Sequence, residues 1–120
     1  MAMKPQLVDL LEAMKALGLK PMHELSPVAA RIQMAETAKA RNVAVIEVGG
    51  VEDRTVPGPA GDIPVRIYRP AGARGKLGAL VYYHGGGHVI GSLDSHDGAC
   101  RAICREAGIV VLSVDYRMGP

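Results

Sequence analysis

The chain has 120 residues, of which 48% are hydrophobic and 22% are charged, and its formal net charge is +2. This composition is typical of one small globular domain, and a charge so close to neutral, with no basic cluster, excludes the electrostatic footprint of a nucleic-acid-binding protein. Apolar residues never run to about 18 in succession, so we expect no membrane span.

The chain is predicted to begin with an amphipathic helix that Gly18 ends. Asp9 and Glu12 lie within its apolar pattern, which is unlike a secretory signal, and we therefore expect a cytoplasmic protein. The apolar side recurs at helical spacing and consists of Leu7, Leu10, Leu11, Met14 and Leu17.

A second helix is predicted from Pro27 to about Arg41. The hydroxyl of Ser26 can cap its first turn, and proline is favoured at the first helical position because that N–H has no partner within a helix. We expect the buried side of this helix to consist of Val28, Ile32 and Ala35.

An antiparallel hairpin is predicted next. Its first strand lies at about Val51 to Val56, and its turn lies in the Pro- and Gly-rich residues 57–62. In the second strand apolar residues alternate with others, as in a half-buried strand near a sheet edge. The inward side consists of Ile63, Val65 and Ile67, and the outward side of Pro64, Arg66 and Tyr68.

The apolar residues 77–83 are typical of a buried strand, which is followed by His84 and by three glycines, residues 85–87. Residues without a Cβ let backbone N–H groups approach a bound anion, either a phosphate or the oxyanion formed in acyl transfer. The spacing disfavours two phosphate-binding loops. Gly91 lies one residue too late for G-x-G-x-x-G, and Ser92 stands where a P-loop has lysine.

A helix and another strand complete the pattern. Asp94 or Ser95 can cap the helix, Gly108 ends it, and the apolar residues 109–114 are typical of a strand covered on both faces. Strand, helix and strand then make a parallel crossover unit. The apolar side of the helix consists of Cys100, Ile103, Cys104 and Ala107. We interpret both cysteines as buried thiols, because no second pair completes a metal site.

Four blocks of sequence carry a resemblance to a known family. They are Arg66-Ile67-Tyr68-Arg69-Pro70, Val81-Tyr82-Tyr83-His84-Gly85-Gly86-Gly87, Gly91-Ser92-Leu93-Asp94-Ser95-His96-Asp97 and Ser113-Val114-Asp115-Tyr116-Arg117. Their order and spacing resemble those of the hormone-sensitive-lipase-like (HGGG-type) esterases, a branch of the α/β-hydrolases. The resemblance implies the N-terminal portion of an α/β-hydrolase fold, a mostly parallel sheet with flanking helices. Residues 1–45 would form an N-terminal helical cap segment, and residues 46–120 the first strands and first core helix.

The resemblance also implies which residues form the site. The backbone N–H groups of Gly86 and Gly87 match the family's oxyanion-hole donors, Gly85 allows the tight turn, and His84 supports the loop. His88 is expected to contact substrate, at a position where the family more often has a bulky aromatic residue beside the pocket. Neither a metal nor an organic cofactor is implied.

The chemistry that such an enzyme needs is incomplete in this sequence. A serine nucleophile requires a G-x-S-x-G turn, and no serine has glycines at both positions two residues away. The serines are Ser26, Ser92, Ser95 and Ser113. We therefore expect the triad to lie outside a truncated chain, which by itself should be inactive and fold poorly. The full-length protein is expected to be a carboxylesterase or lipase-like serine hydrolase of short to medium acyl esters, and a homodimer is left open.

Other interpretations stay open. A non-catalytic protein that binds a small ligand can share an α/β-hydrolase scaffold, because fold does not determine function. A phosphate-binding α/β domain would bind nucleotides tightly. His96 and Asp97 could form a proton relay, or join His88 and Asp94 in a metal cluster, but the spacing favours helix capping and loop hydrogen bonds. Asp115 resembles a family position that buttresses the fold.

Overall fold

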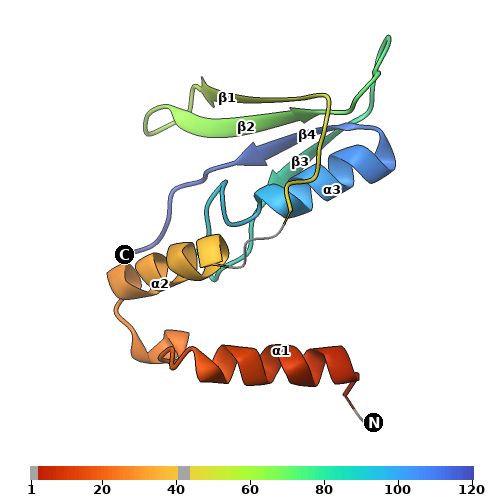
Figure 1. Ribbon diagram of the computed structural model, residues 1–120. Coiled ribbons are helices and arrows are strands. Elements are labelled where there is room, and N and C mark those ends of the chain that lie inside the picture. Colours follow the sequence, from red (N-terminus) through yellow and green to blue (C-terminus); the bar gives the residue numbers. More distant parts are fainter. Residues whose placement is uncertain (1–2, 41–43) are drawn as a thin grey trace.

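The structure is a computed structural model that describes residues 3–40 and 44–120 (Figure 1). Each helix and strand expected from the sequence is present, although the predicted end of the second helix near Arg41 lies outside the described residues. The elements in chain order are α1 (Pro5–Ala16), a 3-10 turn (Met22–Glu24), α2 (Pro27–Ala40), β1 (Gly50–Val56), β2 (Ile63–Arg69), β3 (Ala79–Tyr83), α3 (Asp97–Ala107) and β4 (Val110–Val114).

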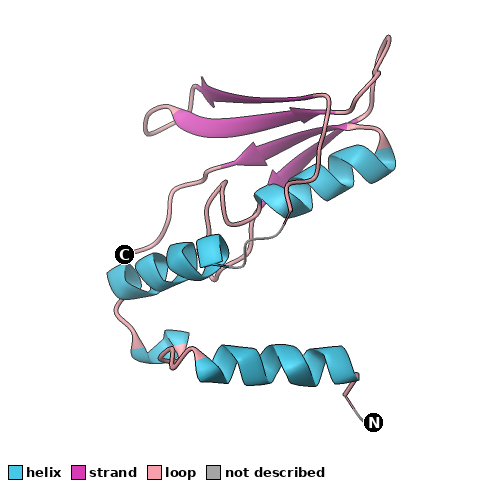
Figure 2. Ribbon diagram, viewed as in Figure 1, coloured by secondary structure: helices cyan, strands magenta, loops and turns pink. Residues whose placement is uncertain are grey.

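The strands form one sheet in the order β1-β2-β4-β3 (Figure 2). β1 and β2 are the predicted antiparallel hairpin, β2 and β4 are also antiparallel, and β3 and β4 are parallel. The expectation of a mostly parallel sheet is therefore corrected to a mixed one for the described strands. β2 was expected near an edge and lies in the interior, because the chain returns from β3 through α3 and inserts β4 beside β2.

α3 packs on one face of the sheet and forms the main core with it (Figure 1). Gly108 ends the helix in the left-handed conformation, at φ 64°, as its position after the last apolar residue predicts. The side chains buried at the centre of the cluster are those of Tyr68, Cys100, Cys104 and Val111. Both cysteines are free and buried, as predicted, and burial raises the pKa of each thiol.

Tyr68 was expected on the outward side of its strand, and this prediction is wrong. Its side chain is fully buried beneath α3, while Val65, on the opposite side of β2, is almost completely buried as well. The alternation of residues shows which side chains share a face, but it does not show that both faces are covered. The Tyr68 hydroxyl donates to Asp97 Oδ1 at 2.9 Å, which satisfies the buried group.

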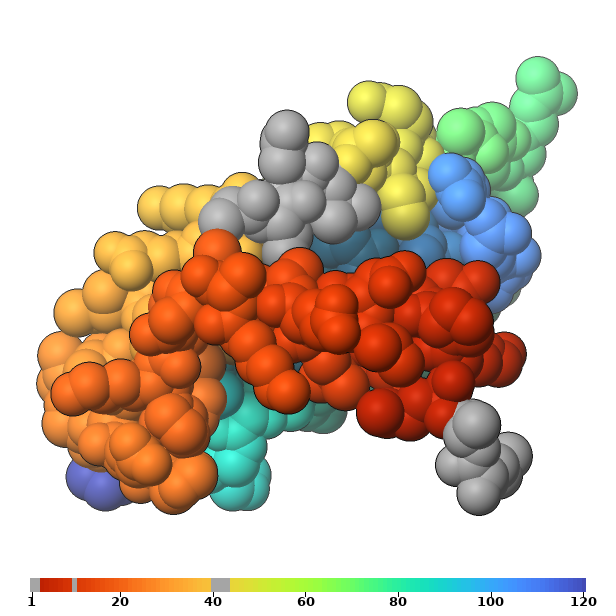
Figure 3. Space-filling model, turned by 60° about the horizontal axis from the view of Figure 1, so that its bottom comes forward, coloured from red at the N-terminus to blue at the C-terminus, as the bar shows by residue number. Residues whose placement is uncertain are grey.

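The N-terminal helices stand apart from this core. α1 crosses the surface of the molecule (red in Figure 3), and the apolar side chains of Leu7, Leu11, Met14 and Leu17 on it are exposed. Ser26 caps α2 as predicted, because the Ala29 N–H donates to its Oγ at 3.3 Å. Within the described part of the chain, neither helix combines the length and hydrophobicity needed to cross a bilayer.

The predicted buried side of α2 is wrong. Val28 is 63% exposed, Ile32 is 54% exposed and Ala35 is exposed too, whereas Ala30 is only 4% exposed. α2 thus turns a small residue inward and large ones outward. The distribution of hydrophobicity around this helix is nearly even, so the sequence pattern alone does not select its inner face.

Candidate functional site

The three glycines follow β3 in a tight turn that places the backbone in unusual conformations. Gly86 has φ 133°, Gly87 has φ 61°, and His88, which is not a glycine, has φ 61°. The carbonyl oxygen of Gly86 accepts hydrogen bonds from the N–H groups of Val89 and Ile90, both at 3.0 Å. A Cβ on Gly86 would lie 1.9 Å from the Ile90 carbonyl oxygen, so only glycine fits at this position.

The N–H groups of Gly86 and Gly87 were predicted as oxyanion donors. Among the described residues they donate to no backbone or side-chain acceptor. Gly85 and Gly87 are exposed and Gly86 is half-buried, so the turn lies at the surface. The geometry is compatible with donation to a bound anion, and the assignment of these residues stays a prediction.

His84 lies directly beneath the turn. Its side chain is buried, and its Nδ1 lies 2.9 Å from the carbonyl oxygen of Gly85, to which it donates in the tautomer that carries the proton on Nδ1. The hydroxyl of Tyr116 donates to the His84 carbonyl oxygen at 2.5 Å. The imidazole is stacked between Tyr116 and His96, with ring centroids 4.4 and 5.3 Å apart. This position suits the predicted role of supporting the loop.

The other nitrogen of the His84 imidazole, Nε2, lies near Asp115. Nε2 has no hydrogen-bond partner among the described residues, and it lies 4.0 Å from Asp115 Oδ1. A Cβ on Gly91 would lie 2.4 Å from His84 Nδ1, so the glycine leaves room for the ring. His84 is therefore enclosed by residues from three segments, which leaves it no room to act as a mobile base.

The segment before α3 differs from the prediction. The helix begins at Asp97 with His96 at the capping position, rather than with Asp94 or Ser95 as cap. Ser95 is engaged elsewhere, because Ser92 and Ser95 exchange hydrogen bonds from each backbone N–H to the other hydroxyl, at 2.8 and 3.1 Å. Burial, and then the neighbouring His84, lower the pKa of His96 below its ordinary value.

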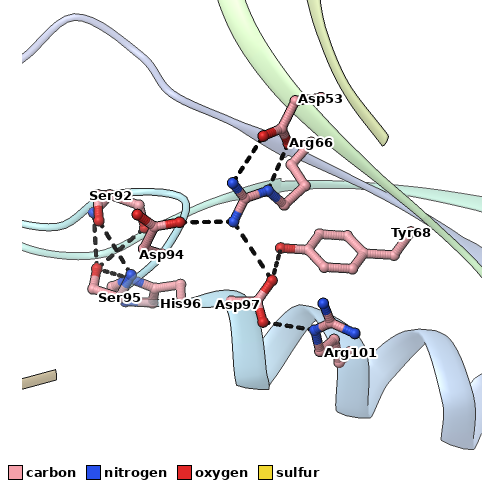
Figure 4. Close-up of polar contacts among 9 residues, drawn as sticks. All are labelled: Asp53, Arg66, Tyr68, Ser92, Asp94, Ser95, His96, Asp97 and Arg101. Atoms are coloured by element: carbon pink, nitrogen blue, oxygen red, sulfur yellow. Dashed lines mark hydrogen bonds and ion pairs between the residues drawn. The ribbon is translucent and has the colours of Figure 1, made fainter. Parts of the chain in front are cut away.

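Arg66 joins the hairpin to this segment (Figure 4). Its guanidinium donates to both carboxylate oxygens of Asp53 on β1, at 2.6 and 2.9 Å, and to Asp94 Oδ1 at 2.8 Å. The hydrogen bond from Arg66 lowers the pKa of Asp53 and raises that of Arg66 itself. The segment after the glycine turn is thereby tied to the hairpin through Asp94.

Asp97 is a structural carboxylate. It accepts the hydroxyl of Tyr68 at 2.9 Å and the Nε of Arg101 at 2.6 Å (Figure 4). His88 and Asp94 do not join it around a common point. Across residues 3–40 and 44–120, no three His, Cys, Asp or Glu side chains are grouped as ligands of one ion.

The roles of two arginines in this region were not predicted from the sequence. The pair of Arg66 with Asp53 could have been found, because the predicted hairpin places opposite charges on facing positions. The other is Arg31 of α2, whose guanidinium contacts the turn after the glycines. No local signal identifies it, because its partners lie 58 and 88 residues away in the chain.

Three hollows lie on the surface of the described residues, and the glycine turn lines none of these three. One of about 460 Å³ is lined by Arg66 and by its partners Asp53, Asp94 and Asp97. Another, of about 590 Å³, lies between α2, residues 44–46 and the start of α3. A third, of about 360 Å³, lies between the hairpin turn and residues 115–117. Each of these three hollows therefore lies away from the predicted donors.

Sequence comparisons match residues 80–120 to a family model described as the alpha/beta hydrolase fold. The carboxylic ester hydrolase LipN of Mycobacterium tuberculosis is 50% identical over 93 residues, which are 78% of this chain and 24% of that protein. The ethyl acetate hydrolase of Pseudomonas putida is 38% identical, over 100% of this chain and 40% of that protein. The chain therefore spans less than half the length of these relatives.

Solved structures agree with the sequence relatives. The hyperthermophilic esterase of the archaeon Pyrobaculum calidifontis is similar with a TM-score of 0.86 and 37% identity, over 100% of this chain and 38% of that one. An ester hydrolase from the metagenome of Lake Arreo has a TM-score of 0.85 and 35% identity, over 98% of this chain and 38% of that one.

Proposed function

This chain carries part of an α/β-hydrolase fold and resembles esterases of that fold throughout its length, and from this premise we propose that the complete protein is a serine carboxylesterase. The predicted α/β-hydrolase fold and the predicted resemblance to its esterases are confirmed, with a mixed sheet in place of a mostly parallel one. The proposal concerns the complete protein, because the sequence of residues 1–120 contains no G-x-S-x-G turn for a nucleophile. The nucleophile, its histidine base and the carboxylate partner would lie outside these residues.

The single observation that carries the proposal is the free pair of amides in the glycine turn. Attack on an ester carbonyl places negative charge on its oxygen, and the N–H groups of Gly86 and Gly87 are available to donate to it. One such donor contributes about 2.7–4 kcal/mol to transition-state stabilisation in comparable enzymes. The stacked and hydrogen-bonded His84 holds the turn from below, so the donors are oriented before the substrate binds.

The substrates would be esters of short to medium acyl chains. The ethyl acetate hydrolase among the relatives acts, by its name, on a short ester. An exposed His88 beside the donors places a polar group where it can contact substrate, and its ring meets that of Tyr116 edge-on at 5.9 Å. Hydrolysis of p-nitrophenyl esters of graded length by the complete protein would give the preferred acyl chain.

The role of the turn is tested by replacing one glycine at a time in the complete protein. Gly86→Ala introduces a Cβ that collides with the Ile90 carbonyl and displaces the donors, so we expect kcat to fall about 100-fold. Gly98→Ala in α3 is the matched control, because a Cβ there meets nothing within 4 Å and the residue lies outside the turn, and its kcat should stay within about threefold of the unchanged protein.

The outcomes separate the proposed function from the alternative. If the complete protein binds esters and hydrolyses none of them, it is a non-catalytic binding protein on a hydrolase scaffold. If esters are hydrolysed and Gly86→Ala turns over at the unchanged rate, the esterase stands and the oxyanion hole lies elsewhere.

A further inference from the structure

One side chain of the N-terminal helices reaches the glycine turn. Arg31 of α2 donates from Nε to the carbonyl oxygen of Val89 at 2.8 Å. One terminal nitrogen donates to the carbonyl oxygen of Gly119 at 2.5 Å. Figure 1 shows the C-terminal segment beside α2, where this bridge forms. Arg31 thus connects three parts of the chain that are remote in sequence.

The same two segments also contact each other directly. The N–H of Gly119 donates to the carbonyl oxygen of His88 at 2.6 Å. Together with the two bonds of Arg31, this contact closes a ring through residues 88–89, Arg31 and Gly119. Both carbonyls that follow the predicted donors are therefore held from outside the turn. A Cβ on Gly119 would lie 3.2 Å from the His88 oxygen, so the approach is close.

The turn needs such support because of its backbone conformation. Three successive residues, 86–88, have positive φ, and the third of them is His88. A left-handed conformation is unfavourable for a residue with a Cβ and persists only where the surrounding contacts hold it. The contacts to the carbonyls of His88 and Val89 hold the turn in this conformation. The orientation of the Gly86 and Gly87 amides depends on that conformation.

Arginine is the side chain that this bridge requires. A guanidinium presents several N–H donors in one plane and can donate to two carbonyls at once, whereas an ammonium is a single point on a flexible stem. A terminal nitrogen of Arg31 also donates to the Pro120 oxygen at 3.1 Å, so the guanidinium faces the backbone oxygens of Val89, Gly119 and Pro120. Its position on α2 also makes it the polar link between that helix and the glycine turn.

We propose that Arg31 is a positioning residue for ester hydrolysis, which couples the N-terminal helix α2 to the oxyanion-donating turn by holding the carbonyls of Val89 and Gly119. The inference rests on the proposed function, because the turn it positions is the proposed oxyanion hole. Arg31 touches no reacting atom. Its removal should therefore let the turn relax, which weakens transition-state stabilisation more than substrate binding.

The test uses the complete protein with Arg31→Met, which keeps the apolar stem and removes all donors, and Arg31→Lys, which keeps the charge. We expect kcat for a p-nitrophenyl ester to fall roughly 10- to 100-fold in Arg31→Met, with KM changed less than about threefold. The kcat of Arg31→Lys should lie between those of Arg31→Met and the unchanged protein, because one ammonium can reach one carbonyl. Lys39→Met is the matched control, since it removes an exposed positive charge from the same helix, and its kcat should not change.

Two further measurements distinguish positioning from a loss of folding. Binding of a trifluoromethyl ketone, whose adduct places an oxyanion in the hole, should weaken by the same factor as kcat. Hydrogen exchange of the peptide covering residues 85–90 should become faster in Arg31→Met, while that of β2 and β4 is unchanged.

Each outcome decides between the two claims. If the unchanged protein hydrolyses esters and kcat of Arg31→Met stays within twofold of it, the positioning role is overturned and the proposed function stands. A fall in kcat with equal loss of protection throughout the sheet would also overturn it. If the unchanged protein hydrolyses no ester, the proposed function is overturned, and this inference with it.

Discussion

The sheet with α3 and the two N-terminal helices are stabilised in different ways. In the first region Tyr68, Val111 and the two cysteines are removed completely from water, and the buried hydroxyl has its hydrogen bond. In the second, Leu7, Leu11 and Met14 of α1 and Val28 and Ile32 of α2 are exposed. α2 is joined to the rest mainly by a small buried alanine and by the polar bridge of Arg31.

The difference shows what an apolar pattern can establish. Apolar spacing identifies residues that could form a buried face, but burial follows only where another element lies against that face. α3 is covered because the chain must cross over from β3 to β4. Nothing comparable in the described residues covers α1. Hydrogen bonds therefore contribute more to holding the N-terminal helices on the molecule. Burial of apolar surface contributes more to the stability of the sheet.

The largest effect is expected at Tyr68. Tyr68→Ala should lower the free energy of unfolding of the complete protein by roughly 3–5 kcal/mol, because it leaves a cavity between β2 and α3. Tyr68→Phe, which keeps the ring and removes only the bond to Asp97, should cost about 1 kcal/mol. Urea denaturation measures both. Equal losses would mean that the hydrogen bond, and not burial, holds this region.

The next effect concerns Ala30, which is buried on the inner side of α2. Ala30→Leu should lower the free energy of unfolding by about 1–3 kcal/mol, because the larger side chain has no room. Val28→Leu, on the exposed side of the same helix, should change it by less than about 0.5 kcal/mol. A large loss with Val28→Leu would show that another part of the complete protein covers this side, and the contrast between the regions would disappear.

A smaller effect is expected for the charged link between the hairpin and the segment before α3. Arg66→Met should lower the free energy of unfolding by about 1–2 kcal/mol, since it leaves Asp53 and Asp94 without their donor. The loss is limited because both carboxylates are largely exposed. Arg54→Met is the control, because its partner Glu52 lies two residues away on an exposed strand, and its effect should be close to zero. Thermal unfolding of both variants provides the comparison.

The smallest effect is a pH dependence that arises at His96. Its pKa is lower in the folded state than the ordinary 6.5, so the unfolded chain binds the proton more readily. This histidine therefore contributes stability that is present above about pH 6.5 and is lost as the pH falls through its folded pKa. Urea midpoints measured between about pH 7.5 and pH 5.5 should fall less in His96→Gln than in the unchanged protein.

Much of the core was predictable from local sequence. The hairpin, the strand before the glycines, the helix that Gly108 ends and the last strand all follow from short-range patterns. The glycine turn was also predicted as a possible anion site from the three glycines that follow the apolar strand. The requirement for glycine in this turn is local, because a Cβ at Gly86 would collide with the backbone four residues later.

Only the tertiary structure decided which distant segments of the chain lie next to one another. The insertion of β4 between β2 and β3 buried Tyr68 and made β2 an interior strand, and the packing of α2 exposed Val28 and not Ala30. The bridges of Arg66 and Arg31 join residues 13 to 89 positions apart. Hydrophobic periodicity and turn chemistry act over a few residues, so the sequence by itself determined the elements and the shape of the turn. The neighbours of each element depend on how the whole chain packs, and these decided which faces are buried and what holds the turn in place.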